Sequence, residues 1–255
     1  MSVKDEDVRQ KICLALDVSS IKDVGELIKQ SIDYVGTYKV GKELFISHGL
    51  DAFKEIHRYE KNIFLDLKLH DIPNTVENAS RAIVKHNVKM FTIHALGGSE
   101  MIKASSKGIS AGAKLYANTP PLILGVTILT SFNNANLKEI LIKQNINSST
   151  LHLAKIALEN GCAGIVCSAK DLLFLRPTLG NDIFYATPGI ETGPKNNLDQ
   201  KRTANPYEAI SNNSSLIIIG RSIINSKERE DTLRTIFEEV RCALKDKSYP
   251  NEFRE

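Results

Sequence analysis

The sequence has no long hydrophobic run. Its longest apolar stretch, Pro120 to Leu129, is far shorter than the ~20 residues that a membrane-spanning helix needs. The first residues, MSVKDEDVRQK, are charged throughout and contain no apolar stretch of the kind found in a secretory signal. We therefore expect a cytoplasmic protein without a membrane partner.

A large excess of charge of one sign is also missing. Lys and Arg number 33 against 30 for Asp and Glu, which gives a formal net charge of +3, and the two signs are interspersed along the chain. A protein that binds nucleic acid normally gathers its basic residues into a block, and no such block is present, so we expect no nucleic-acid partner. Hydrophobic residues make up 42% of the chain, which is enough for a sizeable core and argues against disorder.

Cysteines are few, and their spacing does not fit a metal site. Cys13, Cys162 and Cys167 lie in or beside apolar runs, where a cysteine usually acts as a small buried hydrophobe, and the fourth is Cys242. The sequence has no short C-x2-C pair with an accompanying pair of histidines. We predict reduced thiols and no bound metal.

The sequence does contain a repeated alternation of two patterns. Short apolar runs are followed by amphipathic stretches with apolar residues three and four apart, such as TVENASRAIVKHN. Parallel strands that alternate with covering helices produce this pattern. The eight apolar runs are ICLALDV (12–18), YVGTYKVG (34–41), IFLDLKL (63–69), VKMFTIHA (88–95), PLILGVTIL (121–129), AGIVCS (163–168), DIFYATPG (182–189) and LIIIGRS (216–222).

Eight strand–helix units of roughly thirty residues match a (β/α)8 barrel, whose typical length is ~250 residues. We predict an α/β fold, a parallel eight-stranded TIM barrel with outer helices, as a single domain over residues 1–255 with an N-terminal extension at 1–11. A doubly wound open sheet is the alternative. The first strand–helix turn reads DVSSIKD and lacks G-x-G-x-x-G, so dinucleotide binding has no support and the barrel is favoured.

Charged side chains gather near the predicted carboxyl ends of the strands, where parallel α/β folds bind their ligands. Asp66 and Lys68 are two residues apart on one strand, so their side chains point to the same face, which in a barrel is the interior. Isolated ions there are costly, so the pair should be mutually neutralised. A solvated edge strand is the alternative, but the apolar flanks in IFLDLKL favour a site. The residues at these ends are Asp17, Lys39, Asp66, Lys68, Asp71, His94, Thr130, Gly220 and Arg221.

A phosphate site is predicted at the last two strands. In such barrels the loops after strands seven and eight often bind phosphate through backbone N–H groups. The seventh run ends in Thr187-Pro188-Gly189, and the eighth in Gly220-Arg221, a glycine that permits close backbone approach followed by a guanidinium. The alternative is a surface loop with an unrelated arginine.

The segment from Asp66 to Val76, DLKLHDIPNTV, resembles the D-x-K-x-x-D-I-P-N-T signature of the orotidine 5′-phosphate decarboxylase family, of the bacterial type. This decapeptide is highly specific, whereas TPG or GRS alone would be weak. The resemblance extends from Ile12 to Ser222. The shorter pieces that agree in order are ALDV around Asp17, YKVG around Lys39, VTILTS around Thr130, TPGI around Pro188, DQ at 199–200 and IGRS around Arg221.

This resemblance implies an enzyme of de novo pyrimidine biosynthesis that decarboxylates orotidine monophosphate to UMP without a metal or organic cofactor. It implies that Lys68 protonates C6 of the pyrimidine, and that the chain forms a homodimer in which the partner subunit supplies Asp71 and Thr75. The other residues it implies are Asp66, Lys39 and Asp71 in a charged network with Lys68, Asp17 and Thr75 at the ribose, Thr130 at the base, Gln200, Gly220 and Arg221 at the phosphate, and Ile72 and Pro188 as further substrate contacts.

One residue departs from the family pattern. After TPGI the pattern usually continues with Arg, whereas this chain has Glu191. A carboxylate close to a phosphate repels it unless it points away. Lys195 and Arg202 are the candidates to replace the lost positive charge.

Two other functions remain open at this point. One is a magnesium-dependent sugar-phosphate decarboxylase or aldolase of the same barrel group, which shares D-x-K-x-x-D but not the I-P-N-T and D-Q elements, and which a chelator would inhibit. The other is a non-catalytic barrel that binds a phosphate ligand, which Glu191 favours. Neither His70 nor His94 is assigned a catalytic role.

Overall fold

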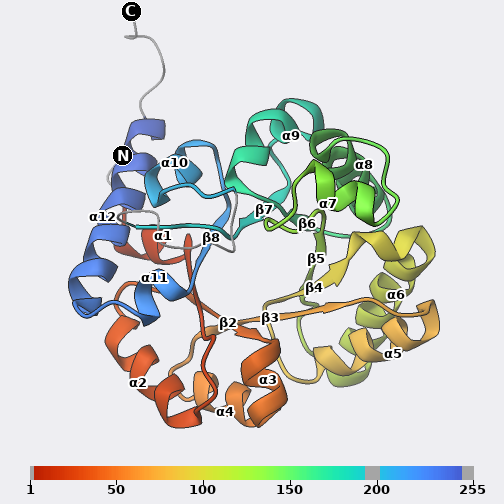
Figure 1. Ribbon diagram of the computed structural model, residues 1–255. Coiled ribbons are helices and arrows are strands. Elements are labelled where there is room, and N and C mark those ends of the chain that lie inside the picture. The colour runs from red at the N-terminus through yellow and green to blue at the C-terminus, as the bar shows by residue number, and fades with distance from the viewer. Residues whose placement is uncertain (1–2, 193–201, 249–255) are drawn as a thin grey trace, which may run out of the picture.

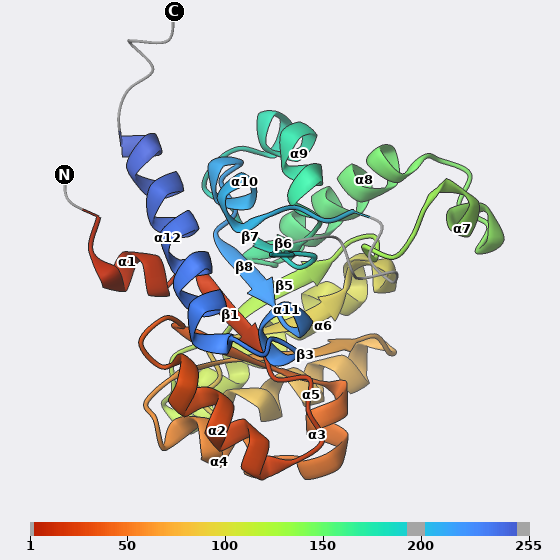
Figure 2. The same ribbon diagram turned by 60° about the vertical axis from the view of Figure 1, so that its left-hand side comes forward.

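The computed structural model describes residues 3–192 and 202–248. Eight strands, all paired in parallel and in sequence order, close into a barrel in which β1 pairs with both β2 and β8. Helices surround this barrel on the outside (Figures 1 and 2), so the predicted TIM barrel is confirmed. The strands are β1 (Ile12–Ala15), β2 (Thr37–Gly41), β3 (Asn62–Leu69), β4 (Met90–His94), β5 (Leu122–Val126), β6 (Gly164–Val166), β7 (Phe184–Thr187) and β8 (Leu216–Ile219).

Each strand coincides with one of the eight apolar runs, and only β3 begins earlier than its run, by one residue. Strand side chains alternate between two apolar clusters. One cluster fills the barrel and includes Cys13, Phe64 and Met90. The other, which includes Tyr38 and Val40, lies between the strands and the outer helices. Burial on both faces explains why the runs are apolar throughout.

Every connection between consecutive strands contains at least one helix. Two connections hold a pair of α-helices, a division that the amphipathic patterns did not predict: α3 and α4 between β2 and β3, and α7 and α8 between β5 and β6. The helices are α1 (Asp5–Arg9), α2 (Ile21–Ser31), α3 (Lys42–His48), α4 (Asp51–His57), α5 (Pro73–Val84), α6 (Gly98–Tyr116), α7 (Asn134–Glu139), α8 (Ile146–Glu159), α9 (Leu172–Leu179), α10 (Pro206–Ser211), α11 (Arg221–Ile224) and α12 (Arg229–Ser248), with short 3-10 helices η1 (Ala95–Gly97) and η2 (Ala169–Asp171).

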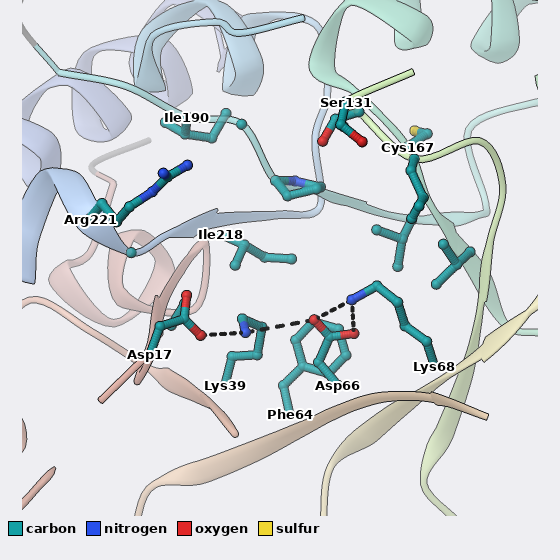
Figure 3. Close-up of a pocket in the computed structure, with 18 of the residues that line it drawn as sticks. Asp17, Lys39, Phe64, Asp66, Lys68, Ser131, Cys167, Ile190, Ile218 and Arg221 are labelled. Atoms are coloured by element: carbon teal, nitrogen blue, oxygen red, sulfur yellow. Dashed lines mark hydrogen bonds and ion pairs between the residues drawn. The ribbon is translucent and has the colours of Figure 1, made fainter. Parts of the chain in front are cut away.

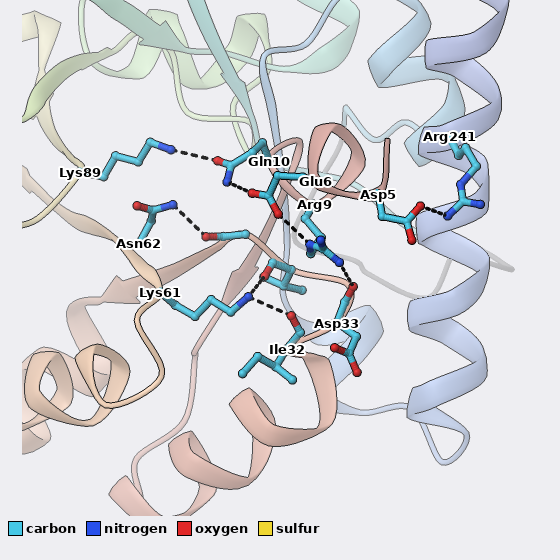
Figure 4. A network of polar contacts seen from close by, with 12 residues as sticks. Asp5, Glu6, Arg9, Gln10, Ile32, Asp33, Lys61, Asn62, Lys89 and Arg241 are labelled. Atoms are coloured by element: carbon cyan, nitrogen blue, oxygen red, sulfur yellow. Dashed lines mark hydrogen bonds and ion pairs between the residues drawn. The ribbon is translucent and has the colours of Figure 1, made fainter. Parts of the chain in front are cut away.

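Helix α1, within the N-terminal extension, packs at the amino-terminal end of the barrel (Figure 4). Its Val8 is fully buried, and Arg9 donates to Glu6 at 3.0 Å and to the carbonyl of Asp33 at 3.3 Å. Gln10, just after the helix, accepts a hydrogen bond of 3.0 Å from Lys89, which precedes β4. These contacts attach the N-terminal extension to the amino-terminal end of the barrel.

None of the described helices has the length and apolarity of a membrane span. All four cysteines are free thiols, three of them buried and Cys242 exposed. Burial raises the pKa of Cys162 to about 12, so this thiol stays protonated at neutral pH.

Candidate active site

A cavity of about 390 Å³ opens at the carboxyl ends of the strands (Figure 3). Its floor is apolar and includes Phe64, Val126 and Ile218 from the barrel interior. Charged and polar side chains stand above this floor. Of the predicted site residues, the cavity brings together Asp17, Lys39, Asp66, Lys68, Thr130, Pro188, Gly220 and Arg221.

Four of these side chains form a continuous chain of alternating charge across the cavity (Figure 3). Lys39 Nζ lies 3.1 Å from Asp17 Oδ1 and 3.6 Å from Asp66 Oδ2. Lys68 Nζ donates to both oxygens of Asp66, at 2.8 and 2.9 Å. The order Asp17–Lys39–Asp66–Lys68 leaves neither cation without a carboxylate, as the predicted mutual neutralisation requires.

The neighbouring opposite charges in this row of side chains offset the cost of burying each of them. Desolvation raises the pKa of Asp66, but Lys68, Lys39 and the hydrogen bonds from Lys68 and Thr92 outweigh it, so the pKa lies below its ordinary value. Burial likewise acts against the charge on Lys39, yet Asp66 and Asp17 raise its pKa. Both groups are therefore ionised at neutral pH. Lys39 is the third of five residues in β2 rather than its last, and it reaches the mouth from inside the barrel.

The backbone at Lys68 departs from a regular strand. The pairing of β3 with β4 shifts between Leu65 and Leu69, and Lys68 has φ of +54°, in the left-handed region that disfavours a side chain. Thr92 on β4 holds this bulge. Its hydroxyl accepts a hydrogen bond of 2.9 Å from the Lys68 backbone N–H and donates one of 2.9 Å to Asp66 Oδ1.

Thr92 was not predicted from the sequence. It is 1% exposed and lies on the same face of β4 as Met90, which belongs to the cluster inside the barrel. The signal that could have found it is a hydroxyl at an inward position of a buried strand, where a polar group needs a partner. Ser131 and Cys167 also line the cavity without having been predicted.

The far end of the cavity is formed by the loops after β7 and β8, where a phosphate site was predicted. Pro188, Gly189 and Ile190 line it, together with Gly220 and Arg221. Gly189 has φ of +81°, which glycine adopts without strain. A Cβ on Gly220 would lie 3.3 Å from Asp17 Oδ2, so glycine leaves the carboxylate its place in the cavity.

Three predicted residues do not line this cavity. Asp71, Ile72 and Thr75 are exposed, on the loop after β3 and the first turn of α5. Asp71 accepts a hydrogen bond of 2.7 Å from the backbone N–H of Ile72, whose apolar side chain is 66% exposed. Within one chain, therefore, Lys68 and Asp71 do not share the cavity.

The comparisons with known proteins identify the family of this chain. The profile of the family described as "Orotidine 5'-phosphate decarboxylase / HUMPS family" matches residues 10–236. The chain belongs to the orotidine 5′-phosphate decarboxylase / HUMPS family. It is 35% identical over 240 residues to a protein of Syntrophotalea carbinolica named orotidine 5′-phosphate decarboxylase, covering 94% of this chain and 98% of that one.

Two further relatives of this family extend the similarity. A protein of Buchnera aphidicola, named orotidine 5′-phosphate decarboxylase, is 37% identical over 231 residues, which is 91% of this chain and 96% of that protein. A crystal structure of orotidine 5′-phosphate decarboxylase from Lactobacillus acidophilus superimposes with a TM-score of 0.78 at 34% identity, covering 91% of this chain and 99% of that one. The similarity thus spans the barrel and the cavity.

The residue that departs from the pattern expected of orotidine 5′-phosphate decarboxylases does not face the cavity. Glu191 is not among the lining residues, although Ile190 beside it is. Its backbone N–H donates to the carbonyl of Ala204 at 3.0 Å, and its Oε1 is buried without a hydrogen-bond partner among the described residues. Lys195 and Gln200 lie outside the described residues.

Arg202, the other candidate to supply positive charge at the phosphate, is engaged elsewhere. Its Nη1 forms an ion pair of 2.5 Å with Asp171 Oδ1. Arg202 is thus bound to a carboxylate and does not line the cavity.

No three of the described His, Cys, Asp and Glu residues gather in a way that could hold a metal ion. The two histidines near the mouth, His70 and His94, have ring centroids 5.5 Å apart. Burial, and after it the electrostatic effects of the neighbouring His70, Lys68 and Lys42, lower the pKa of His94 to about 4, so this ring is neutral at pH 7. Its Nδ1 is buried and has no hydrogen-bond partner within the part of the chain that the structure describes.

Proposed function

We propose that this chain decarboxylates orotidine 5′-monophosphate to UMP in pyrimidine biosynthesis. The observation that carries the proposal is the ammonium of Lys68, held by both oxygens of Asp66 at the mouth of a barrel that belongs to this family. Decarboxylation breaks the bond between C6 of the pyrimidine and its carboxyl carbon. CO₂ leaves, and the electron pair stays on C6 in the plane of the ring.

Lys68 stabilises this carbanion and then protonates it. An ammonium fixed beside the developing charge stabilises the transition state without reorganising at the moment of reaction. A proton then passes from Lys68 Nζ to C6, and the neutral amine regains a proton from solvent. Asp66 sets the direction of the ammonium, and Lys39 offsets the charge of Asp66, 3.6 Å away.

The remaining site residues bind the nucleotide. In this proposal Asp17 binds the ribose, Thr130 the base, and Gly220 and Arg221 the phosphate, with Pro188 as a further contact. Gln200 completes the phosphate site from outside the described residues. Binding energy from the phosphate, far from C6, is then available to orient the reacting end of the substrate.

The proposal includes a homodimer with shared sites. Asp71, Ile72 and Thr75 are exposed and do not line the cavity of their own chain, which supports their action in the site of a partner subunit. An exposed isoleucine beside a carboxylate fits a surface that a second copy covers. We further propose one barrel domain over residues 1–255, extended at 1–11, in the cytoplasm, whose reducing conditions suit four free thiols.

The direct test is turnover of orotidine monophosphate by the purified chain, measured as formation of UMP and CO₂. We expect turnover with and without EDTA, because no metal takes part in the proposed chemistry. Turnover that depends strictly on magnesium would instead favour the sugar-phosphate enzymes of the same barrel group. Binding of the nucleotide without turnover would favour a non-catalytic barrel.

Replacing Arg221 with alanine should weaken catalysis only for substrates that carry the phosphate. Loss of a hydrogen bond to a charged group costs about 1.5–3 kcal/mol, so we expect kcat/KM for orotidine monophosphate to fall by about 10- to 100-fold. The nucleoside orotidine, which lacks the phosphate, should lose nothing. The matched control is Arg234→Ala on α12, whose side chain is 67% exposed and pairs with Asp231. Equal losses on both substrates would mean that Arg221 is not a phosphate ligand.

A further inference from the structure

Arg202 and Asp171 form an ion pair that contacts residues lining the cavity without lining it themselves. Their side chains are only 14% and 3% exposed. Asp171 Oδ2 also accepts a hydrogen bond of 3.0 Å from the backbone N–H of Ser168, so both oxygens of this carboxylate are occupied. Burial raises the pKa of Asp171, and the charge of Arg202 opposes this effect. A pair this well enclosed holds the arginine in one place.

Arg202 belongs to one of the loops that line the cavity and forms hydrogen bonds with two others. Its Nη2 donates to the carbonyl oxygens of Ile128 and Leu129, both at 3.4 Å, in the loop after β5. Its own carbonyl accepts a hydrogen bond of 3.3 Å from the hydroxyl of Ser168, in the loop after β6. Arg202 itself lies in the connection between β7 and β8.

The contact with the β5 loop bears directly on the substrate pocket. Ile128 and Leu129 line the cavity, and they are followed at once by Thr130 and Ser131, which line it as well. β5 ends at Val126, so this segment is no longer held by strand pairing of its own. The hydrogen bonds from Arg202 to these two carbonyls fix the orientation of the peptide groups that lead to Thr130.

We propose that Arg202, held by Asp171, is a positioning residue that places the segment Ile128–Ser131 against the substrate. This inference rests on the proposed decarboxylation. Arg202 does not line the cavity, so it acts through that segment rather than by contact with the nucleotide. A planar guanidinium can bind a carboxylate through one nitrogen and two carbonyls through another, whereas a lysine ammonium cannot span the same three acceptors in this geometry.

The experiment compares Arg202→Met, Arg202→Lys and the double variant Asp171→Leu/Arg202→Met with the native enzyme, measuring kcat, KM and thermal stability. A misplacement of about 1 Å can cost ~10²-fold in rate, and we expect a fall of that order in kcat/KM for Arg202→Met. Arg202→Lys should keep the ion pair and recover part of the loss. The matched control is Arg241→Met, which removes an ion pair of 3.0 Å with Asp5 at the other end of the barrel and should leave both kinetic constants unchanged.

The double variant separates positioning from stability. It leaves no unpaired buried charge, although the backbone N–H of Ser168 loses its acceptor, so its melting temperature should recover in part from that of Arg202→Met toward the native value. Its kcat/KM should stay low, because the carbonyls of Ile128 and Leu129 still lack their donor. Recovery of activity together with stability would show a merely structural role and overturn the inference.

A double-mutant cycle identifies the segment through which Arg202 acts. Interaction energies arise between residues that act through a shared element. The effect of Arg202→Met should therefore shrink when Thr130 and Ser131 are both replaced by alanine, and should persist in the Arg221→Ala background. If the native enzyme turns over and the kinetic effects of Arg202→Met and of the Thr130/Ser131 replacements are fully additive, this inference is refuted and the proposed function is not. Absence of native turnover would refute the proposed function, and this inference with it.

Discussion

Lys68→Ala should abolish decarboxylation while leaving the barrel folded. The change removes the proton donor and the cation beside C6 together. Loss of one transition-state electrostatic donor typically costs ~10²–10³ in rate, and the loss of the proton source adds to this. The fold should survive because Asp66 keeps Lys39 at 3.6 Å and the hydroxyl of Thr92 at 2.9 Å as partners. The measurement is UMP formation under single-turnover conditions, with circular dichroism as the check on folding.

The matched control for this variant is Lys107→Ala. Lys107 also forms an ion pair with a carboxylate, 3.0 Å from Glu77, but its side chain is 74% exposed and outside the cavity. Its removal should leave turnover unchanged. Alanine carries the same Cβ as lysine, so Lys68→Ala adds no new backbone strain at φ of +54°. Near-native turnover of Lys68→Ala would end the assignment of this residue as proton donor.

Mixing Lys68→Ala with Asp71→Ala should restore activity that neither variant has alone. In the shared-site dimer each site takes Lys68 from one chain and Asp71 from the other. In a mixed dimer one site carries both defects and the second carries none. With equal amounts and random reassortment, about a quarter of all sites should be active, by symmetry alone. The measurement is turnover after subunit exchange, with exchange verified by a mass tag.

The control for this experiment is a mixture of Lys68→Ala with Asp66→Ala. Asp66 and Lys68 of one chain are in direct contact at 2.8 Å, so they serve the same site. A mixed dimer of these two variants has no intact site and should stay inactive. If mixed dimers of Lys68→Ala and Asp71→Ala form and remain inactive as well, Asp71 acts within its own chain, and the shared-site proposal is wrong.

The eight strands could be predicted from the sequence because a strand buried on both faces must be apolar throughout. The residues at which the strands end could not be predicted from the same apolar pattern. Ile128 and Leu129 belong to the fifth apolar run, yet β5 ends at Val126, and these two residues line the cavity instead. An apolar residue that lines a pocket and one that packs between strand and helix look alike in a sequence.

The contact between Asp66 and Lys68 was predicted from their spacing and is confirmed at 2.8 Å. The left-handed backbone of Lys68 and its support by Thr92, 24 residues away, had no local signal. The same holds for Arg202 and Asp171, which are 31 residues apart in the sequence. Spacing predicts partners along one strand, whereas partners on different elements depend on the folded arrangement.

At Lys68 the residue that would best stabilise the backbone differs from the residue that the proposed chemistry needs. A side chain in the left-handed region costs of order 1–3 kcal/mol, and glycine at the same φ of +54° avoids most of that cost. A substitution chosen for stability from the backbone geometry of this position alone would therefore replace the lysine by glycine. The result would be a more stable barrel whose cavity lacks the ammonium of Lys68. Six of the described non-glycine residues have positive φ, and Lys68 is the one among them that lines the cavity, so the unfavourable backbone and the proposed chemistry meet at one residue.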